Sequence, residues 1–246
     1  MIEHQIDIST DDGQMATFIT HPESGGPFPV VLFLMDAPGK REELHDMARR
    51  ISATGYYVML SNLYYRDVRS FLVHREDPAS TEHMFELMSN LDNRIVAVDA
   101  AAMLAHADAD AVADASRVGV AGYCMSGPFA LWIAAEFPDV VKSAASIHGV
   151  RLAVDAEDSP HTRVAEMKGE ILVMAAEHDD YVDRAHYDRL VGAFNTAGTK
   201  AHCEWVPGAH HGFVYPNRAK FDKVAAERHW ELLYSLFDRT LKNQQV

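Results

Sequence analysis

Runs of uninterrupted apolar residues alternate with helical patterns along most of the chain, and this alternation restricts the possible fold more than any other feature of the sequence. The runs "VVLFLM", which begins at Val30, and "EILVMAA", which begins at Glu170, are typical of strands buried on both faces of a parallel sheet. Helical patterns lie between such runs, and the pattern "REELHDMARRISATG" ends at a glycine. Because parallel strands need right-handed crossovers, usually through helices, the sequence predicts an α/β fold with a mostly parallel central sheet flanked by helices.

The first 20 residues predict an antiparallel hairpin in front of this sheet. The segments "HQIDIS" and "MATFIT" have strand character and flank the turn signal Asp11-Asp12-Gly13. The chain has 246 residues, of which 48% are hydrophobic, so it can bury one large core. We find no internal repeat, low-complexity segment or domain linker, and we therefore expect a single domain over residues 1–246.

One long connection lacks the regular spacing of apolar residues that would indicate a helix or a strand. Residues 62–81 contain several tyrosine, phenylalanine and arginine side chains, and long connections in compact domains are often lids or binding loops. We expect a single long helix after it, from about Glu82 to Ala109, and a final helix from about Arg218 to Leu241. The remaining predicted elements are the strands "YYVMLS", "RVGVAG", "VKSAASIH" and "KAHCEWV" and the helices "GPFALWIAAEF" and "RAHYDRLVGAFNTAG".

The charge and the N-terminus exclude several classes of protein. The net charge of −14 repels phosphate backbones and anionic lipids, so nucleic acid and membrane surfaces are not expected partners. The N-terminal segment has acidic residues and no apolar core, and no apolar stretch approaches the roughly 20 residues that a membrane-spanning helix needs. We expect a cytoplasmic protein, in which the two cysteines, Cys124 and Cys203, remain thiols.

Cys124 lies at a sharp junction between a strand pattern and a helix pattern, in "VGVAGYCMSGPFALW". A strand that turns directly into a helix exposes the turn residue at the carboxyl edge of the sheet, and Gly122, Ser126 and Gly127 are small enough for the backbones to approach closely. The positive end of the helix dipole favours a thiolate there. The next amide, that of Met125, points to where a carbonyl oxygen becomes an oxyanion. These features predict a nucleophile, although a free cysteine can also be a small buried apolar residue.

A base and an orienting carboxylate are available at two further strand ends. "EHDDYVD" follows the strand "EILVMAA", and "PGAHHGF" follows the strand "KAHCEWV". We assign the carboxylate to Asp179 rather than to Glu177 or Asp180, and the base to His211 rather than to His210. The order nucleophile, acid, histidine is the one that a strand-to-helix nucleophile of this kind uses.

With these motifs in place, the chain resembles the dienelactone hydrolase family of α/β-hydrolases from about Pro29 to the last helix. The segments "GYCMSG", "EHDDYV" and "GAHHGF" look like that family's nucleophile, acid and histidine motifs. The resemblance implies an α/β-hydrolase fold and a triad of Cys124, Asp179 and His211. In "FLMDAPG" it implies that Asp36 contacts the resting nucleophile and that the amide of Ala37 completes the oxyanion hole.

The resemblance also suggests residues that bind substrate. At a few positions, however, the sequence differs from the family pattern. "SNLYYR" looks like the family segment that leads to a carboxylate-binding arginine, which implies this role for Arg66; Arg69 and Arg75 are the other nearby cations. We also expect Tyr64, Tyr65 and His148 to contact substrate, although each could equally serve packing. Asp36 is one methylene shorter than the family's glutamate, Ser126 replaces a glycine, and Pro128 replaces a small residue.

Together these features predict a cysteine hydrolase of a small ester or lactone, working as a monomer or homodimer without metal or organic cofactor. An ordinary carboxylesterase, a thioesterase or an acyltransferase would use the same triad. A metal-dependent hydrolase would need His210 and His211 with Asp179 or Asp180 as ligands, but adjacent histidines on an extended chain point to opposite sides. A non-catalytic binding protein would have an unreactive Cys124. For comparison, Cys203 lies inside a predicted strand, and we expect it to react slowly.

Overall fold

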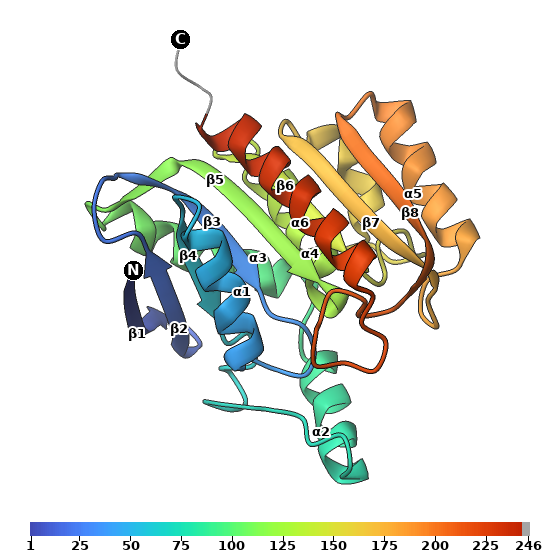
Figure 1. Ribbon diagram of the computed structural model, residues 1–246, viewed down its shortest axis with the longest axis horizontal. Coiled ribbons are helices and arrows are strands. Elements are labelled where there is room, and N and C mark those ends of the chain that lie inside the picture. The colour runs from blue at the N-terminus through green and yellow to red at the C-terminus, as the bar shows by residue number, and fades with distance from the viewer. Residues whose placement is uncertain (243–246) are drawn as a thin grey trace.

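The eight strands of residues 1–242 belong to one sheet, in which only β2 runs opposite to the other strands (Figure 1). The computed structural model describes residues 1–242, so the last four residues of the predicted domain lie outside the described residues. The strand order is β1-β2-β4-β3-β5-β6-β7-β8. The strands are β1 (Ile2–Thr10), β2 (Gly13–His21), β3 (Phe28–Leu34), β4 (Tyr57–Ser61), β5 (Ala113–Tyr123), β6 (Val141–Ile147), β7 (Glu170–His178) and β8 (Ala201–His210).

The sheet confirms the predicted α/β-hydrolase architecture and its N-terminal hairpin. β1 pairs with β2 and β2 with β4 in antiparallel register, whereas β4, β3, β5, β6, β7 and β8 are parallel neighbours. The carboxyl ends of the parallel strands therefore share one edge of the sheet, where groups on the following loops can meet.

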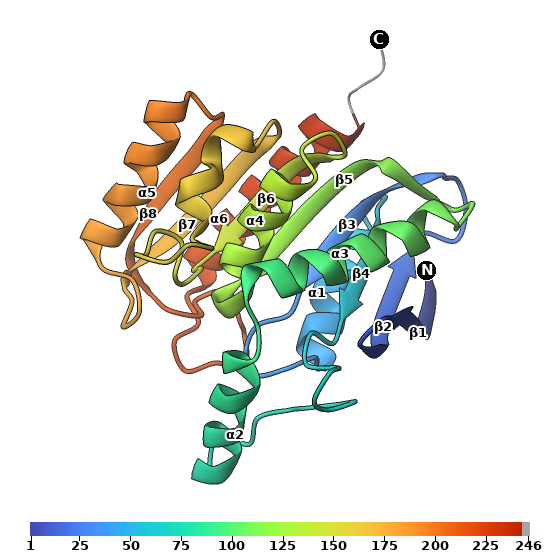
Figure 2. The same cartoon turned by 180° about the vertical axis from the view of Figure 1, so that it is seen from behind.

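Helices cover both faces of the sheet. The helices are α1 (Glu42–Ser52), α2 (Pro78–Ser89), α3 (Asn93–Asp108), α4 (Gly127–Glu136), α5 (Arg184–Ala197) and α6 (Lys223–Phe237). α1 and α6 lie on the face turned to the viewer in Figure 1, and α3, α4 and α5 lie on the face seen in Figure 2. α4 is buried along nearly its whole length, as its uniformly apolar sequence requires.

The predicted helix from Glu82 to Ala109 is wrong, because the chain forms two helices there. α2 ends at Ser89, and the carboxylate of Asp92 accepts a hydrogen bond from the Ile95 amide at 2.7 Å, which caps the start of α3. α2 projects from the body beyond the carboxyl edge of the sheet (Figures 1 and 2). The predicted loop of residues 62–81 is therefore irregular only up to residue 77.

Two other predicted boundaries also move. β8 continues past the predicted "KAHCEWV" to His210, because His210 pairs with His178 beyond a bulge in the β7–β8 ladder. The last helix begins at Lys223 rather than at Arg218, since Asp222 accepts hydrogen bonds from two amides of its first turn. It ends in one π-helical turn, Asp238–Lys242.

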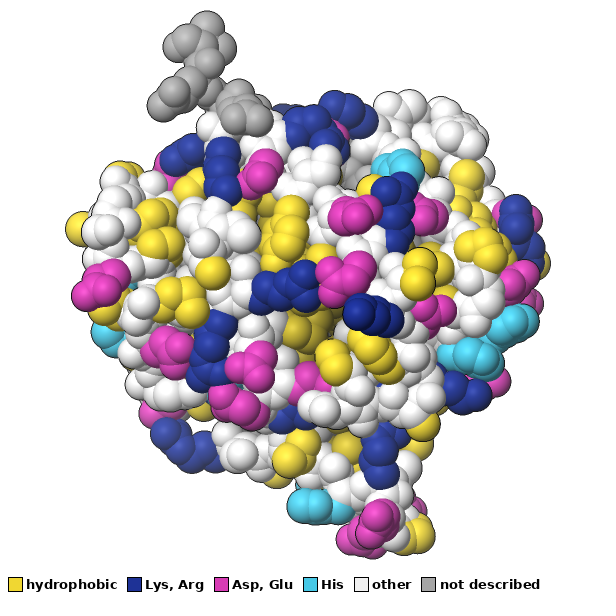
Figure 3. Space-filling view, viewed as in Figure 1, with side chains coloured by type: hydrophobic (Ala, Val, Ile, Leu, Met, Phe, Trp, Pro, Cys, Tyr) yellow, Lys and Arg dark blue, Asp and Glu magenta, His cyan; other side chains and the backbone are white. Residues whose placement is uncertain are grey.

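The surface carries both signs of charge. Acidic and basic side chains are interspersed over the face shown in Figure 3, without one continuous basic patch. Within residues 1–242, no helix combines the length and the apolar character that crossing a bilayer requires.

Candidate active site

Cys124 occupies a tight turn between β5 and α4. One 3₁₀ turn, Cys124–Ser126, is all that separates the two elements, and Cys124 has a φ of 55°, which is unusual for a residue with a side chain. This backbone strain is typical of a residue held for function. Cys124 is partly exposed, so its thiol is accessible.

The small residues around Cys124 allow its turn to close. A Cβ atom added to Gly122 would lie 2.0 Å from the Ser126 carbonyl oxygen, so only glycine fits there. Ser126 is fully buried, and its hydroxyl accepts a hydrogen bond from the Tyr123 amide at 2.8 Å and lies 3.2 Å from the Leu34 carbonyl oxygen. This serine therefore ties the turn to β3 and does not line a pocket.

Gly122→Ala is expected to destabilise the protein by about 3 kcal/mol or more, because the new methyl group meets backbone that cannot move without opening the turn. The matched control is Gly192→Ala in α5, where an added Cβ has no neighbour within 4 Å. That change should stabilise the protein by about 0.5–1 kcal/mol, since alanine favours helix over glycine. Urea unfolding of the two variants measures both effects, and equal stabilities would contradict this account of the turn.

Asp179 and His211 meet at the carboxyl edge of the sheet. Nδ1 of His211 lies 2.7 Å from Oδ2 of Asp179, and the other carboxylate oxygen accepts a hydrogen bond from the Tyr181 amide at 2.9 Å. The Asp179 side chain is 1% exposed, so both of its oxygens are fixed. By contrast, the carboxylate of Glu177 accepts a hydrogen bond from the Gly208 amide at 2.7 Å, and Asp180 is exposed.

The other nitrogen of His211, Nε2, is buried and has no hydrogen-bond partner among the described residues. Burial disfavours the imidazolium, but the hydrogen bond to Asp179 and the nearby Cys124 outweigh burial and raise the pKa of His211 to about 10. The His211 ring therefore readily holds a proton on Nε2, the nitrogen that does not face Asp179. The Tyr181 and His211 rings pack in a T-shaped arrangement, with 4.9 Å between their centroids.

His148 lies behind the His211 ring and does not reach a substrate. The two ring centroids are 4.9 Å apart, and the His148 side chain is fully buried. Burial, and then the charge of His211, hold the pKa of His148 well below its usual range. His148 thus stays neutral and does not compete with His211 for the proton, which corrects the expectation that it binds substrate.

Tyr64 is also buried rather than exposed to substrate, and it joins the two residues expected to form the oxyanion hole. Its hydroxyl donates to the Ala37 carbonyl oxygen at 2.9 Å and lies 3.3 Å from the sulfur of Met125. Ala37 follows β3, and Met125 follows Cys124, so Tyr64 links the ends of two neighbouring strands. The Tyr64 side chain is thus fully buried against the two residues that flank the expected oxyanion position and does not line the cleft at Cys124.

A cleft of about 400 Å³ opens above Cys124, and we call it the nucleophile cleft. Cys124, His211, Tyr181 and Ala37 line it, together with Met84, Phe85 and Met88 of α2 and the cations Arg75, Arg218 and Lys220. Arg75 forms no ion pair within residues 1–242, and burial, followed by the charge of Arg218, lowers its pKa. Asp180 also lines the cleft, so three cations and one carboxylate face this space.

Arg66 and Tyr65 lie outside this cleft. Arg66 forms two hydrogen bonds to the buried carboxylate of Asp99, at 2.7 and 3.0 Å, and a third to Asp12. The Tyr65 hydroxyl also binds Asp99, at 2.9 Å, and only 7% of the residue is exposed. The buried carboxylate draws both side chains away from any substrate. Of the three arginines proposed from the sequence, only Arg75 lines the cleft, since Arg69 pairs with Asp7.

Asp36 does not make the expected contact with the nucleophile. Its carboxylate is buried between two guanidinium groups, with Oδ1 2.5 Å from Arg41 and Oδ2 2.8 Å from Arg218. Both of these guanidinium groups, those of Arg41 and Arg218, lie over the Tyr215 ring. Sequence patterns did not identify Arg218 as a cleft residue, because only the fold brings the loop after His211 to this cleft.

The residues of the alternative metal site diverge. His210 packs against His178, with ring centroids 5.1 Å apart, while His211 faces Asp179. In the described part of the chain, no three His, Cys, Asp or Glu side chains converge as metal ligands.

Comparisons with known proteins find relatives that span nearly the whole chain. Residues 15–241 match the sequence model of the dienelactone hydrolase family. A protein of Methylorubrum extorquens named "Putative carboxymethylenebutenolidase" is 29% identical over 96% of this chain and 81% of its own length. A Synechocystis protein of the same name is 24% identical over 96% of each chain.

Two solved structures share the fold over nearly the whole chain. A structure named "Putative Dienelactone Hydrolase" from Klebsiella pneumoniae has a TM-score of 0.86 at 22% identity, covering 97% of this chain and 98% of its own. A dienelactone hydrolase-like promiscuous phosphotriesterase from metagenomic libraries has a TM-score of 0.79 at 20% identity, with coverage of 97% and 98%.

Proposed function

Since the chain belongs to the dienelactone hydrolase family, we propose that it is a hydrolase of small esters or lactones that uses Cys124 as its nucleophile. The observation that carries the proposal is the Asp179–His211 pair beside a strained, accessible cysteine. The relatives named as carboxymethylenebutenolidases support the reaction class, because that activity opens a lactone.

In the proposed first half-reaction, the Cys124 thiolate attacks the ester carbonyl carbon and forms the carbon–sulfur bond. The amides of Met125 and Ala37 hold the resulting oxyanion, and Tyr64 keeps these two residues together. The carbon–oxygen bond then breaks, and His211 gives its proton to the leaving alcohol or, for a lactone, to the hydroxyl end of the opened ring. A thioester on Cys124 remains.

In the second half-reaction, His211 takes a proton from water, and the hydroxide attacks the thioester. The carbon–sulfur bond breaks, the acid is released, and the proton stays on His211 beside the regenerated thiolate. Asp179 orients the ring throughout and raises the pKa of His211. Arg75 and Arg218, which line the nucleophile cleft, favour a substrate that carries a carboxylate.

The proposal is tested by alkylation with iodoacetamide at pH 7, followed by peptide mass spectrometry. We expect rapid modification of Cys124 in parallel with loss of p-nitrophenyl acetate hydrolysis. Cys203 is the internal control, because burial raises the pKa of its thiol to about 11 and leaves it protonated at neutral pH. Activity that survives full alkylation of Cys124 would refute the cysteine mechanism.

A further inference from the structure

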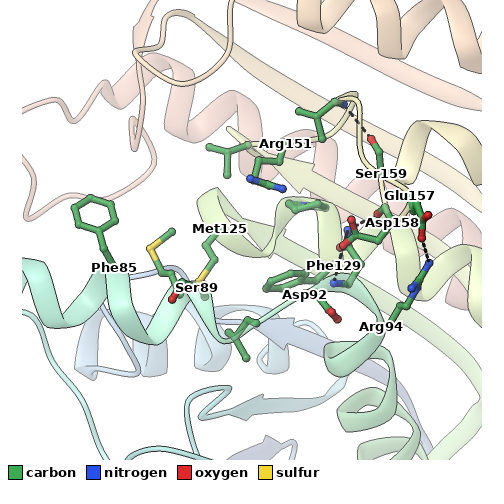
Figure 4. A pocket seen from close by; sticks show the side chains of 16 residues that line it. Phe85, Ser89, Asp92, Arg94, Met125, Phe129, Arg151, Glu157, Asp158 and Ser159 are labelled. Atoms are coloured by element: carbon green, nitrogen blue, oxygen red, sulfur yellow. Dashed lines mark hydrogen bonds and ion pairs between the residues drawn. The ribbon is translucent and has the colours of Figure 1, made fainter.

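A second cleft of about 580 Å³ adjoins the nucleophile cleft, and Figure 4 shows it from close by. Phe85, Met88 and Val150 line both clefts, so the two clefts are neighbours and share this part of their walls. We call this second space the Met125 cleft, because the Met125 side chain lines it and not the nucleophile cleft.

The Met125 cleft lies next to the turn that carries Cys124. Met125 directly follows Cys124, and the amide of Val150 donates a hydrogen bond to the Cys124 carbonyl oxygen at 3.1 Å. His211 and Tyr181 line only the nucleophile cleft. The Met125 cleft thus adjoins the Cys124 turn without being lined by His211.

Apolar side chains form the free inner surface of the Met125 cleft. They are Phe85, Met88, Leu91, Met125, Pro128, Phe129, Val150 and Val154. In Figure 4, Met125 and Phe129 lie on the wall formed by the start of α4, and Phe85 extends from α2 at the other end.

Several polar groups that line the Met125 cleft are already paired, whereas Arg151 also lines it and forms no ion pair or side-chain hydrogen bond within residues 1–242. The Asn93 amide donates to the Asp158 carbonyl oxygen at 2.6 Å, and Arg94 lies 3.6 Å from Glu157. These pairs are drawn as dashed lines in Figure 4. Because paired groups gain little from a ligand, the apolar part of the cleft is suited to an apolar group, and Arg151 adds one unpaired positive charge to the lining.

We propose that the Met125 cleft receives the acyl group of the substrate, whereas the leaving group occupies the nucleophile cleft. The inference rests on the proposed function. The leaving oxygen must face His211 to receive its proton, so the acyl substituent of the same carbon points elsewhere. The adjoining apolar space accepts a linear chain of about six to ten carbons or an aromatic ring, given its volume. The enzyme therefore acts on esters with a larger apolar acyl group.

The test compares two esters that share one leaving group, p-nitrophenyl acetate and p-nitrophenyl hexanoate. Each methylene that enters an apolar site improves kcat/KM roughly threefold, so the wild-type enzyme is expected to prefer the hexanoate by well over tenfold. Val154→Phe fills part of the Met125 cleft. It should lower kcat/KM about tenfold for the hexanoate and leave the acetate within about twofold of wild type.

Val224→Phe is the matched control, because it makes the same substitution at an 81% exposed position of α6 that lines neither cleft. Ser89→Phe, at an exposed position of α2 that lines only the Met125 cleft, repeats the test should Val154→Phe fold poorly. Both esters should react normally with Val224→Phe.

The outcomes separate this inference from the proposed function. The acyl assignment would be overturned if Val154→Phe and Ser89→Phe lowered kcat/KM equally for both esters, or if the wild-type enzyme did not prefer the hexanoate. The proposed hydrolase function would stand in either case. A folded wild-type enzyme that hydrolyses neither ester would overturn the proposed function itself.

Discussion

Replacing Cys124 with alanine is expected to lower kcat/KM for p-nitrophenyl acetate by about 10⁴-fold or more, with little change in stability. The substitution removes the atom that forms the thioester, so neither the His211 proton nor the oxyanion hole can act on a covalent intermediate. Cys124 is partly exposed, and the loss of one sulfur atom there leaves no large cavity. Steady-state kinetics with thermal unfolding of the same sample checks both parts.

Cys203→Ala is the matched control for this experiment. It removes the other thiol of the chain, which lies in β8 away from the cleft, and activity should remain within about twofold of wild type. A chelator should not alter either result. If Cys124→Ala retained wild-type turnover, the nucleophile would have to be a different group, and the strained turn would have another purpose.

Asp179→Asn is expected to lower kcat/KM by about 10³–10⁴-fold while the fold is kept. The amide preserves the size of the side chain but cannot hold a charged partner, so His211 loses the interaction that raises its pKa to about 10. Asp180→Asn changes an exposed neighbour in the same loop and should cost no more than about twofold. Comparable losses in the two variants would remove the special role assigned to Asp179.

The same variant has a distinct pH signature. Above pH 10 the wild-type His211 loses the proton that the leaving group needs, so kcat/KM should fall there, and Asp179→Asn should move this fall to lower pH.

The pH dependence of stability follows from the pKa of His211, which is higher in the folded state than in the unfolded state. The imidazolium–carboxylate pair contributes fully below about pH 6.5, and its contribution is lost as the pH rises through about 10. The difference in unfolding free energy between wild type and Asp179→Asn should therefore shrink over this range. Urea unfolding at pH 6 and pH 10 measures it, and a constant difference would contradict the charged pair.

The candidate triad could be located from sequence because each member follows a parallel strand. Local patterns reveal where a strand ends, and a parallel sheet brings its carboxyl ends to one edge. The choice of Asp179 over Asp180 also depended on local spacing, and the structure places the Asp179 carboxylate, not the exposed Asp180, against His211.

The expected substrate contacts could not be found in this way. Arg66 and Tyr65 follow a strand end as the triad residues do, yet both turn to the buried Asp99, which lies 33 and 34 residues further along the chain. Asp36 pairs with Arg218, which is 182 residues away. No local pattern specifies such partners, because a charged side chain on a loop pairs with whichever opposite charge the fold places nearby.

The sequence by itself therefore determined the order of the strands, most of the helices between them, the strand-to-helix turn at Cys124, and the sheet edge to which Asp179 and His211 belong. Those features follow from periodicity and from the steric demands of short turns, which act between near neighbours in the chain. Only the tertiary structure decided which arginines face the nucleophile cleft, where α2 projects, and that a second apolar cleft adjoins Met125. These depend on contacts between distant segments, whose geometry is set when the whole core packs together.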